Sequence, residues 1–173
     1  ASLFSAESTP GFGAGGQFRA RLGNRLNTEW YADLLKNDIG GLGSRTDSHI
    51  GWSVMFYPKW YESTLNPYFI AGHCFDYTKV LAFESYLHNQ KEVDRWSSAV
   101  QAGLGTSWNI SNRVNFSFSA QYSMHLGGDI HADVDEHFGI EELHIHKEEK
   151  TGVEGHLLVT LSTNFLIADL WKK

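Results

Sequence analysis

The longest regular pattern in the chain is an alternation of apolar and polar residues from Val114 to Val134. The even positions are almost all apolar, whereas the odd positions carry mainly serine, asparagine, histidine and aspartate. A period of two residues is typical of a β-strand with one apolar and one polar face. The run is much longer than an ordinary strand of about five or six residues. It therefore predicts either a barrel strand that continues beyond its barrel or two strands in one line.

The same alternation recurs along the chain and predicts seven strands. They cover Phe12–Leu22, Leu26–Leu34, His49–Tyr57, Tyr68–Tyr77, Trp96–Ile110, Val114–Val134 and Glu142–Ile167. Single-chain bacterial barrels have an even number of strands, so either residues 1–8 form a short first strand or one lies upstream. We predict a short N-terminal strand beside the last one. The faces of Tyr68–Tyr77 stay unassigned, because both carry large apolar residues, and His73 is expected to point inward.

The polar faces predict a polar interior and a lipid-facing exterior. Their residues near Ser117 and Ser119 are small and uncharged, unlike a sheet face in contact with water. Pairing Leu22 with Leu26 places Arg19 opposite Glu29, which predicts an ion pair inside the barrel. Eight strands enclose a space that side chains just fill, so we expect a blocked interior instead of a wide pore.

The connections between the strands fall into two classes. Short turns follow Leu22, Tyr57 and Ile110, whereas long polar loops, including Asn37–Ser48, follow Lys36, Thr78 and Leu126. All long loops would then lie at one end, as in outer-membrane barrels. Tryptophan and tyrosine residues lie mostly near strand ends, where aromatic girdles are expected.

Together, the alternating strands, the Arg19 and Glu29 pair and the long final hairpin resemble the small eight-stranded outer-membrane barrels of Gram-negative bacteria. This resemblance implies an all-β, antiparallel up-and-down transmembrane β-barrel of eight strands with a protruding C-terminal hairpin. It implies a single domain over residues 1–173 and a multi-pass location in the cell outer membrane. Family members include anchors, adhesins, resistance factors and a few lipid-A-modifying enzymes, so fold alone assigns no activity.

Charge and cysteine content narrow the function classes. The chain carries 14 Lys and Arg against 20 Asp and Glu, a net charge of -6. Nucleic acid is therefore excluded as the expected partner, because phosphate binding needs clustered basic residues. Cys74 is the single cysteine, so it forms no intrachain disulfide and is expected to be a small buried residue.

The first candidate site combines Ser123, His125, Glu154 and His156. Folding the last hairpin about Phe138 and Gly139 pairs Val134 with Leu143, Met124 with Val153 and Phe116 with Leu161. The same register places Ser123 opposite Glu154 and Gln121 opposite His156. A serine, a histidine and a carboxylate within reach are the parts of an acyl-transfer site. Lipid A deacylases of similar shape direct such a triad toward lipid, whereas this parity points inward, which favours an interior polar network.

The second candidate site is the tip of the same hairpin. The register sets His131 against His146 and Asp133 against His144, a ligand set suitable in type for a divalent metal. No tight spacing motif accompanies these residues, so a solvated charged extension without a cofactor is the favoured interpretation.

The sequence thus favours a non-enzymatic outer-membrane barrel, although whether the chain is an enzyme stays open. Its external loops, especially Leu126–Glu149, would contact a partner protein, a glycan or lipopolysaccharide. Expected partners are outer-membrane lipids, lipopolysaccharide and other outer-membrane proteins of a larger envelope complex. One alternative is a membrane-embedded lipid A-modifying hydrolase. The other is a soluble, lipocalin-like ligand-binding barrel, which would require Phe118, Leu157 and Trp108 to point inward.

Overall fold

A computed structural model describes residues 2–6, 9–58, 64–83, 92–137 and 140–168 of the chain, and the side chains of 11–58, 64–83, 92–126, 130 and 155–168. The chain forms β1 (Ser2–Ala6), β2 (Thr9–Arg21), β3 (Leu26–Ile39), β4 (Gly43–Phe56), β5 (Leu65–Ala82), β6 (Glu92–Asn109), β7 (Val114–His137) and β8 (Ile140–Phe165). All of these elements are strands, and no helix among the described residues could cross a membrane. The prediction of an all-β chain is confirmed.

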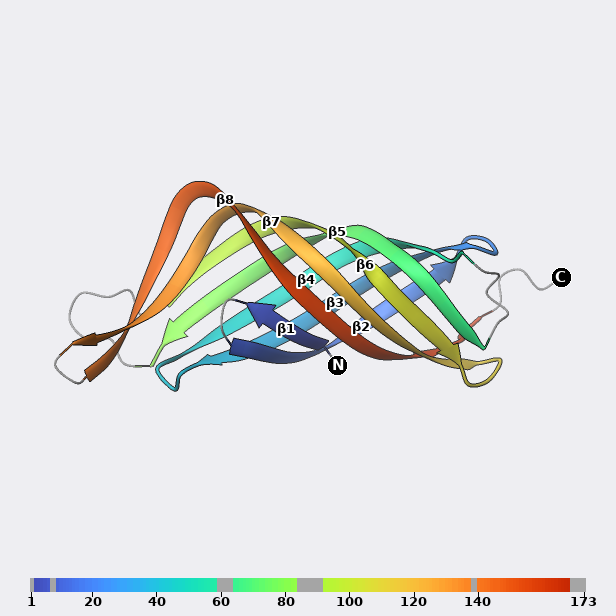
Figure 1. Cartoon of the computed structure of the whole chain (residues 1–173), viewed down its shortest axis with the longest axis horizontal. Helices are drawn as coiled ribbons and strands as arrows, with labels where there is room; N and C mark the ends of the chain where they lie inside the picture. The colour runs from blue at the N-terminus through green and yellow to red at the C-terminus, as the bar shows by residue number, and fades with distance from the viewer. Residues whose placement is uncertain (1, 7–8, 59–63, 84–91, 138–139, 169–173) are drawn as a thin grey trace.

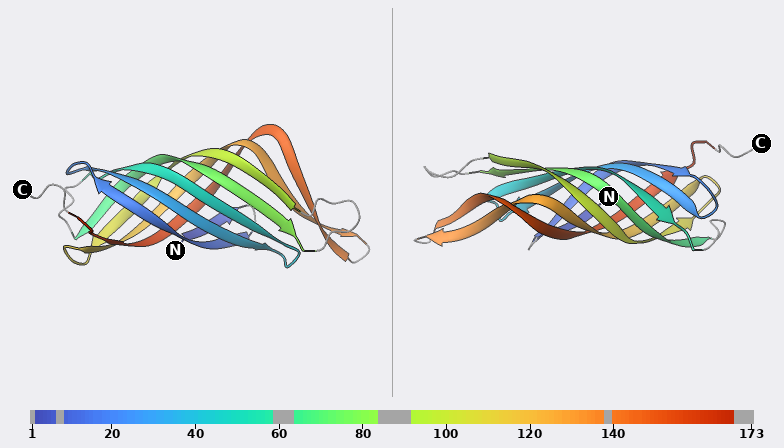
Figure 2. Two further views of the ribbon diagram at one scale, coloured as in Figure 1. Left: turned by 180° about the vertical axis from the view of Figure 1, so that it is seen from behind. Right: turned by 90° about the horizontal axis from the view of Figure 1, so that it is seen from above.

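Every strand pairs antiparallel with its neighbours in the sequence, and β1 also pairs with β8 (Figures 1 and 2). The sheet is therefore closed in the order β1 to β8. The β7–β8 hairpin extends past the other strands at one end of the barrel (Figure 1), which we call the hairpin end. At the opposite end, the turn end, residues 22–25 and 110–113 connect neighbouring strands.

The register between β2 and β3 follows the prediction, with Arg19 opposite Glu29. The predicted register between β7 and β8 is correct only for the outer part of the hairpin, where Val134 pairs with Leu143. An irregularity between Gly127 and Asp129 shifts the pairing. A bulge of this kind changes the residues that face each other without ending the ladder. On the barrel side, Met124 pairs with Gly155 and not with Val153, and Phe116 pairs with Thr163 and not with Leu161.

The strands extend further toward the hairpin end than the sequence predicts. The predicted loop Asn37–Ser48 is wrong, because β3 continues to Ile39 and β4 begins at Gly43. Gly40 and Gly41 in the tight connection have φ angles of 60° and 76°, a left-handed conformation that glycine adopts without steric cost. Likewise, β5 continues to Ala82, beyond its predicted end at Tyr77, and residues 84–91 of the predicted loop lie outside the described residues.

The two faces of the sheet are chemically opposite. Large apolar side chains are exposed on the outer face of the described strands; they include Phe18, Trp30, Trp52, Phe69, Phe75, Trp96, Leu104, Trp108, Phe118 and Leu157. Polar side chains are buried on the inner face; they include Asn27, Glu29, His49, Ser53, Asn66, Asp76, Gln101, Ser107, Ser117 and Gln121. The three side chains that the lipocalin-like alternative would turn inward, Phe118, Leu157 and Trp108, therefore point outward.

Apolar side chains fill the interior at both ends of the barrel. Toward the turn end, Met55 and Ile70 pack in one cluster with Tyr57 and Tyr68. Toward the hairpin end, the members of the cluster are Val80, Ala82, Val93 and Ile130. The sequence pattern placed Ile130 on the outer face together with Leu126, which is exposed. This prediction is wrong for Ile130, which follows the irregularity in β7 and is 4% exposed.

Candidate functional site

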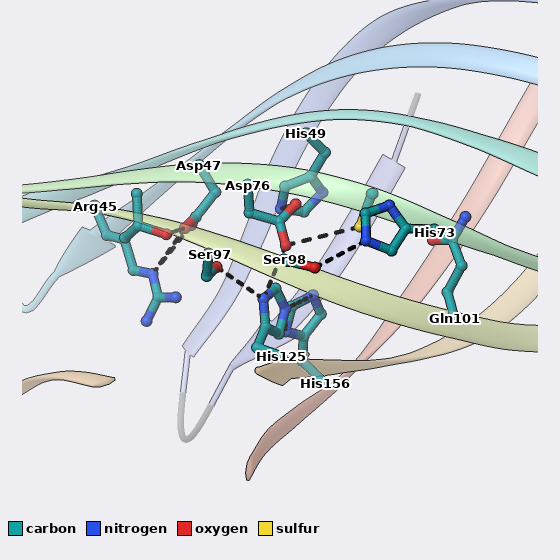
Figure 3. A network of polar contacts seen from close by, with 12 residues as sticks. Arg45, Asp47, His49, His73, Asp76, Ser97, Ser98, Gln101, His125 and His156 are labelled. Carbon is teal, nitrogen blue, oxygen red and sulfur yellow. Dashed lines mark hydrogen bonds and ion pairs between the residues drawn. The ribbon is translucent and has the colours of Figure 1, made fainter. Parts of the chain in front are cut away.

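A network of polar side chains from several strands lies buried inside the barrel (Figure 3). His125 Nδ1 lies 2.8 Å from Asp76 Oδ2, and His125 Nε2 lies 2.9 Å from His156 Nδ1. The ring of His49 stacks against that of His156 at 5.9 Å, and its Nε2 is 3.6 Å from Asp76 Oδ1. All four side chains are buried. We call these four residues the histidine–aspartate cluster.

Strand alternation and register bring this cluster together from four strands. The register pairs His49 on β4 directly with Asp76 on β5, and both side chains face the interior. Asp76 in turn pairs with Ser97 of β6, whose hydroxyl is 3.3 Å from His125 Nδ1. Asp76 is 1% exposed, and its buried carboxylate contacts the imidazole rings of His125 and His49.

The polar network continues along the interior on both sides of the cluster. Toward the hairpin end, Thr78 donates a hydrogen bond to Asp47, which also pairs with Arg45 at 3.0 Å. Toward the turn end, the Tyr31 hydroxyl donates to Gln101 Oε1 at 2.8 Å. Gln101 Nε2 then donates to the hydroxyl of Ser53, also at 2.8 Å. The barrel interior is thus crossed by hydrogen-bonded side chains from several strands.

The predicted ion pair between Arg19 and Glu29 closes the network toward the turn end. The Arg19 guanidinium also lies 5.9 Å from the centre of the Tyr68 ring. Tyr68 fits because of Gly105 on β6, where a Cβ atom would come within 2.3 Å of the ring. Glycine on the inner face therefore makes room for a bulky neighbour in a narrow barrel.

Little free volume remains next to this pair. A cavity of about 10 Å³ is lined by Gln17, Glu29, Tyr31, Asp33, Ser119, Gln121, Leu158 and Thr160. This is close to the smallest space that can hold one water molecule. The side chains at this level leave no room for a ligand of ordinary size.

The structure brings Ser123, His125 and His156 together inside the barrel but changes the pairing of the predicted acyl-transfer residues. Ser123 pairs with His156, and Glu154 pairs with His125, so the predicted pairing of Ser123 with Glu154 is wrong by two residues. Gln121 accordingly lies opposite Leu158 and not His156. The His125 ring contacts Asp76, Ser97 and His156, all inside the barrel. The Glu154 side chain lies outside the described residues.

The predicted metal site at the hairpin tip is described only through its backbone. The ladder places His131 opposite His146 and Asp133 opposite His144. These pairings follow the sequence register, but the four side chains lie outside the described residues. Among the side chains that the structure does describe, no group of three or more His, Cys, Asp or Glu residues could hold a metal ion.

A polar pair on the outer face joins β5 and β6. His73 Nε2 is 2.8 Å from Ser98 Oγ, and the His73 ring packs edge-on against Phe75 at 4.8 Å. Phe75 and Val100, which share the outward parity of His73 and Ser98, are exposed. The prediction that His73 points inward is therefore wrong, because Cys74 and Asp76 take the inner face of β5. Cys74 is a buried free cysteine, as predicted.

Sequence reasoning missed Asp76 and His49 as members of the central cluster. The signal for His49 was present, since Trp52 and Val54 on the outer face of the same strand give His49 inward parity. Asp76 was missed because the faces of its strand were left unassigned.

No protein-family model and no curated protein matches the sequence.

Proposed function

We propose that this chain spans the outer membrane of a Gram-negative cell as a β-barrel whose role is contact and not catalysis. Its hairpin end would contact a partner protein, a surface glycan or lipopolysaccharide, as a subunit of a larger envelope complex. The single observation that carries the proposal is the reversal of faces, with an apolar outer surface around a polar interior. That arrangement is typical of transmembrane barrels.

The apolar outer surface has recognisable borders. On β5 and β6 it is bordered toward the hairpin end by Tyr77 and Trp96, whose rings pack at 4.9 Å. Lys79 is the next outward-facing residue after Tyr77 on β5, and its Nζ forms an exposed ion pair with Glu92 at 2.7 Å. The hydrogen bond from Lys79 to Glu92 raises the pKa of the Lys79 ammonium group. Exposed Leu65 and Trp108 lie at the turn end. A tilted strand needs about nine to eleven residues to cross a bilayer, and the stretch from Leu65 to Tyr77 is longer than that.

The filled interior supports a contact role over a transport role. A barrel that conducts solutes needs an open lumen, whereas the interior here is occupied by hydrogen-bonded side chains. The hairpin end is the part of the molecule that extends furthest from the barrel (Figure 1), so it offers the surface for a partner.

The test of the proposal is folding into a membrane. We expect the purified chain to fold in detergent, to migrate differently on a gel before and after boiling, and to float with phospholipid vesicles in a density gradient. Urea-unfolded chain diluted without lipid is the matched control. A chain that folds and stays soluble without detergent or lipid, with the same mobility before and after boiling, would contradict the proposal.

A second candidate function, the lipid-modifying hydrolase, is favoured by one observation. The hydrogen-bonded His73 and Ser98 are placed on the outer face, where a lipid acyl ester could reach a serine hydroxyl and its base. If this pair hydrolyses lipid A, membranes containing the Ser98→Ala variant will retain acyl chains that the unchanged protein removes. Ser123→Ala is the matched control, because Ser123 is buried in the interior. Under the contact role, the lipid A mass spectra with all three proteins will be identical.

A further inference from the structure

Two short connections at the turn end carry arginines and no acidic residues. Arg113, in the turn between β6 and β7, is the single Lys, Arg, Asp or Glu residue among residues 96–128. Arg21 and Arg25 lie at the turn between β2 and β3. All three arginine side chains are exposed. The connection from β4 to β5, residues 57–64, contains one lysine and one glutamate in the sequence, so its charges cancel.

Backbone hydrogen bonds hold two of these arginines at the rim of the barrel. Tyr57 N, just after β4, donates to Arg25 O at 2.9 Å. Leu166 N, just after β8, donates to Arg113 O at 2.8 Å. Two strands separate the two turns on either side of the closed sheet, so Arg25 and Arg113 lie on opposite sides of the barrel. We call these two residues the turn arginines. Arg21 differs from them, because its guanidinium donates hydrogen bonds to its own turn at 3.2 Å.

Exposed apolar side chains accompany each turn arginine. Leu26 follows Arg25 in the sequence and pairs with Phe56, and both of these apolar side chains are exposed. Leu166, whose backbone is bonded to that of Arg113, is 54% exposed. In a bilayer, such apolar side chains lie among the acyl chains, while the long side chain of a neighbouring arginine extends to the level of the headgroups.

The basic side chains toward the hairpin end have a different environment. There, Lys79 pairs with Glu92 at 2.7 Å and Arg45 pairs with Asp47 at 3.0 Å. Within the part of the chain that the structure describes, no carboxylate forms an ion pair with a turn arginine. Positive charge at the turn end is therefore available to an anionic group outside the protein.

We propose that the turn arginines bind the phosphate groups of anionic phospholipids in the membrane leaflet that surrounds the turn end. The inference rests on the proposed membrane-spanning role. Arginine forms two parallel hydrogen bonds with a phosphate group, which adds geometry to the attraction of charges. A basic residue near an anionic membrane surface favours binding by about 1 kcal/mol, which is about fivefold. Because the two turns lie on opposite sides of the barrel, each holds its own lipid.

Native mass spectrometry of the chain folded in detergent micelles tests the proposal. The probes are phosphatidylglycerol and phosphatidylcholine with the same acyl chains, added to the micelles in equal amounts. Both lipids contain a phosphate group, but the choline group cancels its charge. The chain has a net charge of -6, so a preference for the anionic lipid must come from local positive charge. We expect phosphatidylglycerol to be retained about fivefold more often than phosphatidylcholine.

Two double variants locate the preference. Arg25→Gln, Arg113→Gln should retain the two lipids equally. The matched control, Lys36→Gln, Lys79→Gln, removes the same charge toward the hairpin end and should keep the preference for phosphatidylglycerol. A third variant, Arg25→Lys, Arg113→Lys, keeps the charge at the two turns and should also keep the preference.

Three results would overturn the proposal. The first is equal retention of both lipids by the unchanged chain. The second is an unchanged preference after both turn arginines are replaced by glutamine. The third is an equal loss of preference in the Lys36→Gln, Lys79→Gln variant, which would assign the effect to net charge and not to the turn end.

The boiling-dependent gel shift of the same samples separates this inference from the proposed function. A chain that shows the gel shift but retains both lipids equally keeps the membrane-spanning role and loses the phospholipid site. A chain that does not fold in detergent overturns both.

Discussion

Replacing Leu104 by arginine distinguishes a lipid-facing outer surface from a water-facing one. Leu104 lies on β6 between Phe69 and Ala120 and is 59% exposed. It is midway along the apolar surface, between Trp96 and Trp108. In a bilayer, arginine at this depth destabilises a barrel by about 2–4 kcal/mol. In water, a change at so exposed a position is expected to stay within about 0.5 kcal/mol.

The matched control is Leu22→Arg at the turn end. Leu22 is 54% exposed, almost as much as Leu104, so burial within the protein cannot explain a difference between the two variants. Near the membrane surface the same change is expected to cost about 0–1 kcal/mol. The measurement is urea unfolding of the chain in phospholipid vesicles, followed by tryptophan fluorescence and extrapolated to zero denaturant. Equal free energies of unfolding for both variants would refute the lipid-facing assignment.

Two further predictions concern the interior. Glu29→Gln leaves the Arg19 charge buried without its partner and should lower the free energy of unfolding by about 3–5 kcal/mol. The double variant Arg19→Met, Glu29→Met should lose much less stability. Equal losses of the two variants in urea titrations would contradict this account of the pair. Gly105→Ala brings a Cβ atom within 2.3 Å of the Tyr68 ring and should cost about 1–3 kcal/mol, while Ala102→Gly on the outer face of the same strand tests the effect of backbone freedom alone. If Gly105→Ala does not change the temperature at which heating shifts the gel mobility, the Tyr68 ring moves aside freely.

Strand alternation was the most informative part of the sequence. The side-chain period of two residues fixed the faces of β3 and β6, and the pairing of Leu22 with Leu26 fixed the register that joins Arg19 to Glu29. These features depend only on local sequence and a tight turn. They could therefore be predicted without knowledge of any other strand.

The register of the β7–β8 hairpin could not be predicted on the barrel side of Gly127. Its outer part was predicted correctly, but the irregularity before Asp129 has no unique signal in a stretch rich in glycine. Because the shift is two residues, the faces of the barrel segment were kept and only the partners changed. This shift affected the predicted acyl-transfer site most, because Ser123 pairs with His156 and not with Glu154.

Strand lengths and the central cluster needed tertiary information. Polar residues such as Asn37 and Asp47 suggested a loop, but in a barrel with a polar interior they belong to the inner face of long strands. Asp76 could be placed only after the inner face of β5 was known. Its contacts come from strands far apart in the chain, which no local pattern encodes.

The pairing of β1 with β8 also has a consequence for the order of folding. Ser5 lies opposite Leu157, so closure of the ring joins β1 to β8, a strand that comes much later in the chain. Contacts between such distant parts of a chain form slowly, because a long loop must be ordered before they are gained. Until β8 is synthesised and reaches β1, the growing sheet has two open edges and an apolar face. The cell must therefore protect the nascent chain from aggregation until the ring is sealed.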